Sequence, residues 1–390
     1  VCEITAVMDF ELTSEQELIR ASAREFAARQ IVPHARDWDR VEEIDRSLVP
    51  KLADAGYLGA GWDEEYGGSG LDTVSYALVV EELGKADSSV RGIVSVNVGL
   101  VGKTIARFGT DAQKQEWLPK LASGERLGCY ALTEPGCGSD AAALVTRAER
   151  DGDGWVLSGS KTFITLGSWA SVALVFARTG TDGPKGITCF LVPTDADGFA
   201  SHPIKGKLGL RAQDTAELSL DGVRVPDENR LGELDGGFRV AMSALDVGRI
   251  SLAAGCVGIA QGCLDASVAY SRERTAFGRP IGGFQLVQEL LADIAVETEA
   301  ARLLVWRAAG LADAHVQHTL ESSVAKLYAS EVAVRAANNA VQVFGGYGYI
   351  DEYPVGKYLR DARVATLYEG TSQIQKLIIG RALTGESAFT

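Results

Sequence analysis

The sequence contains few residues of the kinds that bind metals or form disulfide bonds. Only four histidines and six cysteines occur among 390 residues, and no two cysteines have Cys-x-x-Cys spacing. His315 and His318 lie three residues apart without a glutamate between them, so we expect no metal site. The cysteines lie among apolar neighbours, which predicts free thiols, most of them buried, and a reducing, cytoplasmic compartment. They are Cys2, Cys129, Cys137, Cys189, Cys256 and Cys263.

Long apolar runs, excess positive charge and nucleotide-binding glycine motifs are also missing. No apolar run reaches membrane-spanning length, and residues 1–10 lack the pattern of a signal peptide. The 52 acidic residues outnumber the 38 basic ones, which argues against nucleic acid or an anionic membrane as a partner. No Gly-x-Gly-x-x-Gly follows a strand-like run, so a nicotinamide-binding Rossmann domain is unsupported.

The distribution of apolar residues divides the chain into three parts and predicts an α+β multidomain fold. Residues 1–127 have the periodicity of amphipathic helices, and Thr13 to Gln16 form a capping box that opens one of them. Residues 128–236 contain short, alternating, β-branched runs without intervening helices, which predicts an antiparallel barrel or sandwich. Residues 237–390 return to long helical runs joined by short loops, which predicts a four-helix bundle.

Some element bounds follow from the same patterns. A helical run is expected over 88–107, and Asp221-Gly222 is expected to form a turn. The helices of the bundle are expected near 238–272, 284–314, 319–344 and 372–384.

One stretch near the C-terminus, Tyr368-Glu369-Gly370-Thr371, combines the features of a catalytic site. Glu369 lies at the expected start of the last helix, between an aromatic residue and a glycine. Gly370 permits a ligand to approach the backbone, and apolar surroundings could raise the pKa of Glu369 toward that of a general base. A glutamate that only complements the helix dipole is the alternative.

Two stretches of the middle part could present polar groups to a flat ring or a phosphate. Thr133, Gly138 and Ser139 surround a Pro-Gly pair, although a simple turn is the alternative. Phe163 and Thr165 share one face of an expected strand, where they could flank a ring, although a half-buried strand explains them equally.

The last part contains a cluster of cations over 272–280, beside an aromatic residue at a helix junction. Arginine suits pyrophosphate because its planar fork bonds two oxygens, whereas a solvated helix end is the alternative. The stretch 342–349 ends a helix on glycines, which a plain C-cap would also explain. Asp246 and Arg249 have i, i+3 spacing and could pair with each other or contact a ligand.

Taken together and in this order, these stretches resemble the acyl-CoA dehydrogenase family of flavoproteins. The resemblance spans nearly the whole chain, and the order of the matches is more specific than any one of them. The matching stretches are Glu65–Gly70, Gly109–Glu125, Thr133–Asp140, Lys207–Gly209, Asp246–Arg249, Arg272–Pro280, Phe284–Gln285, Gln342–Gly348 and Tyr368–Gln375.

The resemblance implies FAD as cofactor and assigns roles by position. The positions that match the border of the flavin ring are Tyr130, Leu132, Thr133, Gly138, Ser139, Phe163 and Thr165. Those that match the adenine dinucleotide site, commonly shared across a dimer interface, are Arg274, Phe277, Gln285, Gln342 and Gly346. Two further matches to FAD contacts are Thr371 and Gln373. The positions that match the thioester site are Ser139, Asp246, Arg249, Tyr368 and Gly370.

The reaction that the resemblance implies is the α,β-dehydrogenation of a short-, medium- or branched-chain acyl-CoA to the trans-2-enoyl-CoA. Glu369 matches the base that removes the α-proton while flavin N5 takes the β-hydride. Some relatives carry their base at the position of Gly248, which has no side chain here, so Glu369 has no competitor on that helix. We also expect Gly248 to leave room for a branched acyl group, and the helix over 88–101 to close the pocket.

The resemblance also implies an electron-transferring flavoprotein as electron acceptor and a homo-oligomer, commonly a tetramer. An acyl-carrier-protein-linked dehydrogenase of a biosynthetic pathway uses the same thioester chemistry and stays open. An acyl-CoA oxidase with the same base and a non-catalytic member of the fold are further alternatives. A flavin monooxygenase is disfavoured, because it would not need a glutamate base at Glu369.

Overall fold

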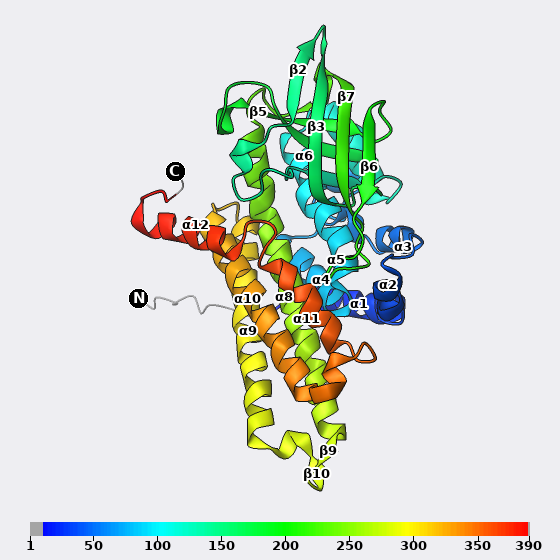
Figure 1. Cartoon of the computed structure of the whole chain (residues 1–390), viewed down its shortest axis with the longest axis vertical. Coiled ribbons are helices and arrows are strands. Elements are labelled where there is room, and N and C mark those ends of the chain that lie inside the picture. The colour runs from blue at the N-terminus through cyan, green and yellow to red at the C-terminus, as the bar shows by residue number, and fades with distance from the viewer. Residues whose placement is uncertain (1–10, 389–390) are drawn as a thin grey trace, which may run out of the picture.

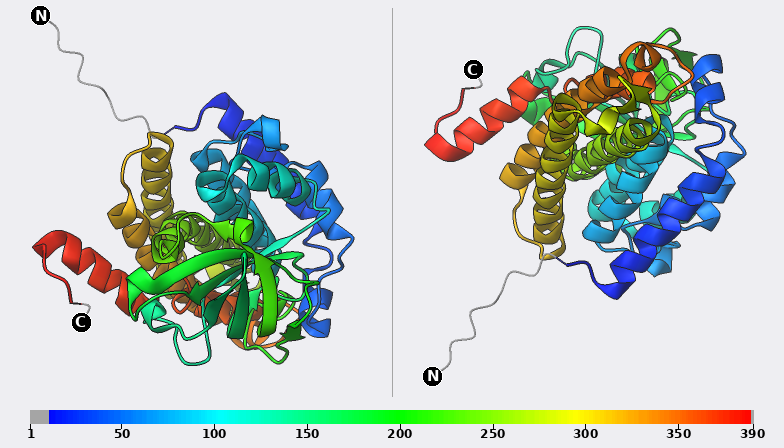
Figure 2. Two further views of the ribbon diagram at one scale, coloured as in Figure 1. Left: turned by 90° about the horizontal axis from the view of Figure 1, so that it is seen from above. Right: turned by 90° about the horizontal axis from the view of Figure 1, so that it is seen from below.

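The computed structural model describes residues 11–388, so Cys2 lies outside the described part. One β-sheet covers one end of the long C-terminal helices, and the N-terminal helices lie along their flank (Figure 1). The end-on views show the same side-by-side arrangement of the two helical groups (Figure 2). The predicted α+β class, with a β part between two helical parts, is therefore confirmed.

The N-terminal helices begin with the predicted capping box, in which the Thr13 and Gln16 side chains each accept a hydrogen bond from the other's backbone N–H. The run expected over 88–107 is one continuous rod, but its middle is a fully buried π-helix, η3 (Ser95–Gly102), a form that often marks functional sites. The α-helices of this part are α1 (Ser14–Gln30), α2 (Ala35–Val41), α3 (Leu48–Asp54), α4 (Thr73–Ala86), α5 (Ser88–Val94), α6 (Lys103–Phe108) and α7 (Asp111–Ala122).

The sheet is mixed rather than purely antiparallel. Most neighbouring strands are antiparallel, as predicted, but β1 runs parallel to β4. Asp221-Gly222 is not a turn, because β7 continues through it as a bulge in which Gly222 has a φ of 66°. The strands are β1 (Gly128–Ala131), β2 (Arg147–Asp151), β3 (Gly154–Thr165), β4 (Val172–Arg178), β5 (Ile187–Pro193), β6 (Phe199–Pro203), β7 (Thr215–Pro226) and β8 (Arg230–Leu231), in the order β6-β7-β3-β2-β4-β5-β8.

The bundle differs from the prediction in its fourth helix. The helix expected at 372–384 is α12 (Ser372–Thr384), which extends away from the bundle (Figure 1). Its place is taken by α11 (Val355–Ala365), which the sequence prediction omits although buried residues recur along it at helical spacing. The other members are α8 (Gly237–Glu273), α9 (Gln285–Asp313) and α10 (Thr319–Phe344), with a hairpin of β9 (Thr275–Ala276) and β10 (Arg279–Pro280) between the first two.

Helix α8 holds the two helical groups together. Within residues 11–388 it is the one helix long and apolar enough to span a membrane, contrary to the expectation from the sequence, but 72% of its most apolar window is buried inside the protein. Such burial is typical of a core helix. On α4, a Cβ at Gly84 would lie 2.8 Å from the carbonyl oxygen of Gly255, so glycine lets the two backbones approach closely.

Candidate active site

The candidate base lies in the loop between α11 and α12. Glu369 and Gly370 both have positive φ, 53° and 88°, which turns the chain sharply before the helix begins. Helix α12 begins only at Ser372, and the Thr371 side chain caps it by accepting from the Ile374 N–H at 3.2 Å. Glu369 therefore lies outside the first turn, and simple complementation of the helix dipole does not explain it.

Two side chains hold this loop from behind. Lys326 on α10 donates from Nζ to the Gly370 carbonyl at 2.7 Å. Gln375 donates from Nε2 to the carbonyls of Glu369 and Gly370, each at 3.1 Å. Both are fully buried, so the loop conformation is fixed by hydrogen bonds that water cannot replace.

The Glu369 carboxylate is poorly solvated and incompletely bonded. The residue as a whole is half-buried, but Oε2 is inaccessible to solvent and has no hydrogen-bond partner within the described chain. Burial raises the pKa of Glu369, and the charges of Arg91, Lys326 and Arg249 oppose that rise. A desolvated carboxylate with a raised pKa and a free lone pair is suited to accept a proton.

The space over Gly248 is filled by the candidate base. A Cβ at Gly248 would lie 2.5 Å from Glu369 Oε2 and 2.7 Å from Leu100 Cδ2. The prediction that Gly248 leaves room for a branched acyl group is therefore wrong. The glycine instead admits the Glu369 carboxylate against α8.

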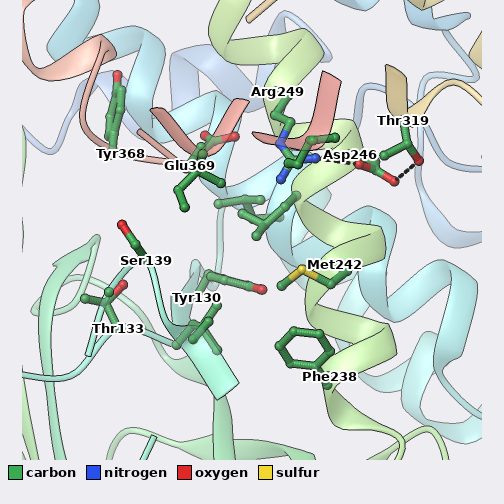
Figure 3. Close-up of a pocket in the computed structure, with 18 of the residues that line it drawn as sticks. Tyr130, Thr133, Ser139, Phe238, Met242, Asp246, Arg249, Thr319, Tyr368 and Glu369 are labelled. Carbon is green, nitrogen blue, oxygen red and sulfur yellow. Dashed lines mark hydrogen bonds and ion pairs between the residues drawn. The ribbon is translucent and has the colours of Figure 1, made fainter. Parts of the chain in front are cut away.

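A cavity of about 1280 Å³ lies in front of Glu369, between the sheet, α8 and the rod formed by α5 and η3. Figure 3 shows Glu369 and Tyr368 on one wall, Asp246 and Arg249 on α8, and Ser139 on the wall that faces them. The predicted residues that line this cavity are Tyr130, Leu132, Thr133, Gly138, Ser139, Phe163, Thr165, Asp246, Arg249, Tyr368, Glu369 and Gly370. The flavin-ring set, the thioester set and Glu369 thus meet in one place.

The predicted adenine dinucleotide set lies elsewhere, near the far end of α8. Arg274 and Gly346 line a separate cavity of about 430 Å³. Phe277 lies between β9 and β10, in the hairpin that Figure 1 shows at the end of the bundle away from the sheet. It is 96% exposed and has a φ of 51°. Gln285 begins α9 and Gln342 lies near the end of α10. Neither Thr371 nor Gln373 lines the main cavity in the described chain.

Sequence reasoning missed two buried cations of the site, Arg91 and Lys326. Arg91 on α5 donates from Nη2 to Tyr368 Oη at 2.8 Å and lines the cavity. Burial lowers the pKa of Lys326 to about 8. Each was detectable as a cation on an otherwise apolar helix face: Lys326 shares a buried stripe with Ala329 and Ala333.

The helix over 88–101 closes the cavity as predicted, but only some of its small or polar residues face it. Gly92 and Ser95 line the cavity. Asn97 points the other way, where it donates to the carbonyl of Leu121 and accepts from the Gly128 N–H. Asn97 therefore joins this helix to the sheet and does not contact the cavity.

The sheet side of the cavity fits a flavin. Phe163 presents an apolar ring that is 69% exposed, and a Cβ at Gly138 would meet nothing within 4 Å, so a flat ligand has room there. The Thr165 hydroxyl accepts from Gln213 Nε2 at 3.1 Å, which leaves its own proton to donate. An open apolar ring beside unused donors matches an isoalloxazine, which is apolar in its faces and polar at its edges.

Comparison with known proteins agrees with this geometry. Models of the acyl-CoA dehydrogenase N-terminal, middle and C-terminal domains match residues 13–125, 129–223 and 235–384. The chain is 47% identical to a probable acyl-CoA dehydrogenase of Bacillus subtilis, over 96% of this chain and 100% of the relative. It is 43% identical to a short-chain specific acyl-CoA dehydrogenase of Clostridium acetobutylicum, over 95% and 98% of the two chains.

Solved structures show the same similarity. Butyryl-CoA dehydrogenase from Megasphaera elsdenii has a TM-score of 0.94 at 41% identity, covering 96% of this chain and 100% of that one. A glutaryl-CoA dehydrogenase from Mycobacterium smegmatis in complex with FADH2 has a TM-score of 0.93 at 37% identity, covering 97% of each chain. A chain from a study of the electron transferring flavoprotein of Acidaminococcus fermentans has a TM-score of 0.95 at 43% identity, covering 97% and 100%. The chain therefore belongs to the acyl-CoA dehydrogenase family and is an FAD-dependent oxidoreductase.

Proposed function

We propose that this protein oxidises a short acyl-CoA to the trans-2-enoyl-CoA by removing one hydrogen from the α carbon and one from the β carbon of the acyl group. The observation that carries the proposal is the Glu369 carboxylate, which lines the cavity and has one oxygen that accepts no hydrogen bond from residues 11–388. FAD, when bound, supplies the acceptor for the β-hydrogen as hydride. Tyr130, Phe163 and Thr165 would hold its ring against the cavity.

Glu369 removes the α-proton in this proposal. Burial raises its affinity for that proton, while Arg91, Lys326 and Arg249 keep enough of it ionised to act as a base. Gly248 lets the carboxylate lie flat against α8, and the bonds from Lys326 and Gln375 keep its loop from moving away. The base is thus pre-positioned before substrate arrives.

Removal of the α-proton requires that negative charge on the thioester oxygen be stabilised. The Glu369 backbone N–H donates to no acceptor among residues 11–388, so it is available to that oxygen. One donor aimed at a developing oxyanion contributes about 3 kcal/mol. The same residue would then supply both the base and an oxyanion donor.

The opposite part of the cavity would hold the arm of CoA that follows the thioester. Asp246 is fixed there, because it accepts from Arg249 Nη1 and from Thr319 Oγ1, each at 2.8 Å. Ser139 faces these residues across the cavity (Figure 3). We propose that Ser139, Asp246 and Arg249 line the path of the substrate.

The separation of the two predicted FAD sets supports a homo-oligomer, which we propose to be a tetramer. From Arg249 to Glu273, α8 rises about 36 Å at 1.5 Å per residue. The set at Arg274 and Phe277 is therefore far from the flavin-ring set of the same chain, and Phe277 is exposed. We propose that the adenine end of FAD is bound by this set from a neighbouring subunit.

The relatives do not select one acyl group, because proteins named for butyryl-CoA and for glutaryl-CoA have nearly equal TM-scores, 0.94 and 0.93. We propose a short acyl group because Arg91, Ser95 and Leu100 close the cavity close to Glu369. Similarity to the chain from the electron transferring flavoprotein study supports that protein as electron acceptor. An acyl-carrier-protein thioester is the second candidate for the substrate's carrier.

The test is anaerobic titration of the purified holoprotein with a panel of acyl-CoAs of graded length. We expect short acyl-CoAs to bleach the flavin absorbance and the enoyl-CoA to form in equal amount. Reoxidation should be fast with electron-transferring flavoprotein and slow with oxygen. If no acyl-CoA bleaches the flavin but an acyl-carrier-protein thioester does, the substrate's carrier is an acyl carrier protein and not CoA.

A further inference from the structure

The side chain of Gln213, two residues before β7 begins, lies in the cavity wall between the sheet and α5. Gln213 is 5% exposed and lines the cavity. Its Nε2 donates to Thr165 Oγ1, at the end of β3, at 3.1 Å. On α5, a Cβ at Gly92 would overlap Gln213 Oε1 and would lie 2.8 Å from its Cδ. The amide of Gln213 therefore spans the space between the flavin-ring side of the cavity and α5.

The backbone of Gln213 is held in place by its own loop and by the bundle. Its N–H donates to the Leu210 carbonyl at 3.1 Å, and its carbonyl accepts from Lys207 Nζ at 3.0 Å. The Leu210 N–H in turn donates to Oδ1 of Asp361, a buried residue of α11, at 2.7 Å. The loop before β7 is thus joined to α11, and the Gln213 side chain starts from a fixed position beside Thr165.

A second buried glutamine, Gln113 on α7, shows what a purely structural amide looks like in this protein. Gln113 is 8% exposed, and its Nε2 donates to the carbonyls of Glu228 and Arg230 at 2.7 and 2.9 Å, while its Oε1 accepts from the Thr110 N–H at 3.0 Å. Among residues 11–388, the Gln213 amide makes one hydrogen bond, and its partner is a hydroxyl group that lines the cavity. This difference indicates that the Gln213 amide serves the cavity and not the fold.

The bond from Gln213 determines which way the Thr165 hydroxyl can act. An amide N–H can only donate, so Thr165 Oγ1 is the acceptor in this bond and its own proton must point elsewhere. No group of residues 11–388 accepts that proton. Because Thr165 lines the cavity, the acceptor that remains is a ligand within it. Without Gln213 the hydroxyl hydrogen would be free to rotate about the Cβ–Oγ1 bond.

We propose that Gln213 is a positioning residue of the flavin site, which holds the Thr165 hydroxyl as a hydrogen-bond donor to the edge of the isoalloxazine ring. The inference rests on the flavin-ring set of the proposed function and on no property of the acyl group. A donor held at an acceptor atom of the ring stabilises the negative charge that the ring gains on reduction. Gln213, acting through Thr165, therefore raises the reduction potential of the bound flavin.

The experiment measures the reduction potential of the free holoprotein, equilibrated with a dye of known potential and without any acyl-CoA. Gln213→Met keeps the size of the side chain but removes the donor, so we expect the equilibrium constant for reduction to fall by about fivefold, or about 20 mV for a two-electron couple. Thr165→Val should lower the potential at least as much. The double variant should match Thr165→Val alone, because Gln213 acts through Thr165.

A second variant tests the same contact without changing either bonded residue. Gly92→Ala places a methyl group where the Gln213 amide now lies, so it should displace the amide from Thr165 and lower the potential in the same direction. If Gln213→Met does not fold, Gly92→Ala decides the question. Gln113→Met is the matched control, and its flavin should keep the wild-type potential even if the protein is less stable.

Three results would overturn the role of Gln213. They are an unchanged potential in Gln213→Met or, where that variant does not fold, in Gly92→Ala; a raised potential in either, which would mean that Oε1 and not Nε2 bonds Thr165; and additive effects of Gln213→Met and Thr165→Val. Because the potential is measured without substrate, none of these results depends on the proposed dehydrogenation, which the bleaching titration tests separately.

Discussion

Two buried cations of this protein, Lys161 in the sheet and Arg91 in the cavity, differ in how completely the fold supplies their hydrogen-bond partners. Lys161 is completely buried, and its ammonium donates to Glu134 Oε1 at 2.8 Å and to the carbonyls of Phe176 and Leu132 at 2.7 and 3.2 Å. All three of its protons are used inside the fold. Among residues 11–388, Arg91 keeps an unused donor, Nε, and its hydrogen bonds go to hydroxyl groups of Tyr368 and Ser95 and to no carboxylate.

The difference indicates what each charge is for. A charge that serves the fold is completed by the fold, because any remaining imbalance lowers stability. A charge that serves a ligand remains incomplete until the ligand arrives. Among residues 11–388, Glu369 and Arg91 each have a buried atom without a hydrogen-bond partner, whereas all three protons of Lys161 are used.

The largest expected effect is on turnover, when the cavity carboxylate Glu369 is replaced. Glu369→Gln keeps the size of the side chain but removes its basicity, so we expect turnover to fall by about a thousandfold or more. FAD content should be unchanged, and the melting temperature should not fall. Glu331→Gln is the matched control, since Glu331 accepts from Ser372 Oγ at 2.6 Å, does not line the cavity and should keep near-normal turnover. Full activity of Glu369→Gln with an acyl-CoA that the wild type uses would refute the assignment of the base.

The next largest effect is on folding stability, when Lys161 in the sheet is replaced. Lys161→Met leaves Glu134 buried and uncompensated, so we expect the free energy of unfolding to fall by about 3–5 kcal/mol. Urea denaturation followed by circular dichroism measures it. The double variant Lys161→Met with Glu134→Leu should recover part of the loss. A single variant as stable as the wild type would show that this pair does not serve the fold.

A smaller effect tests the geometry of the base. Gly248→Ala places a methyl group where Glu369 Oε2 and Leu100 now lie, so the carboxylate must move and kcat should fall by about tenfold to a hundredfold. Stability should change little. Gly310→Ala on α9 is the matched control, because its Cβ would meet nothing within 4 Å, and it should gain about 0.5–1 kcal/mol. Unchanged kcat in Gly248→Ala would mean that the base does not need this position.

The smallest expected effect is on the pH dependence. Because burial raises the pKa of Glu369, kcat should decline on acidification at a higher pH than an ordinary glutamate would give. Lys326→Met removes one of the cations that oppose this rise, so the acid limb should move to higher pH, by less than about one unit. Exposed Lys376 on α12 is the control: Lys376→Met should leave the profile in place. A shift toward lower pH in Lys326→Met would contradict the electrostatic role of Lys326.

The same pKa shift has a consequence for stability with a definite sign. A carboxyl group whose pKa is raised in the folded state binds more protons there than in the unfolded chain. Glu369 therefore lowers the free energy of unfolding as pH rises from the unfolded pKa through the folded one. In Glu369→Gln this pH-dependent loss should be absent from urea denaturation curves measured across that range.

Sequence reasoning succeeded where the signal is local. Glu369, Gly370 and the capping residue Thr371 are adjacent in the chain, so their proximity needs no tertiary information. The two helical parts and the β part follow from the periodicity of apolar residues, which burial itself imposes. The same reasoning misjudged Gly222, because a glycine with positive φ suits a bulge as well as a turn.

It failed where several distant elements determine one position. Helix α11, rather than α12, joins the bundle, although both are helices of similar length. Gly248 was expected to border open space, but the Glu369 carboxylate from the loop before α12 fills it. Neither result can be inferred from the pattern within one segment, since each depends on which faces meet.

The amino-acid sequence alone determined the family and the three-part order of the fold, and it singled out Glu369 as the candidate base, because each is carried by short motifs or by periodicity along the chain. Only the tertiary structure brought Arg91, Lys326 and Arg249 around Glu369, from helices separated by many residues. Whether a buried charge is balanced depends on the sum of all the groups that surround it in space. That sum, which leaves Arg91 without an ion-pair partner among residues 11–388, is the property of the site that the linear sequence does not contain.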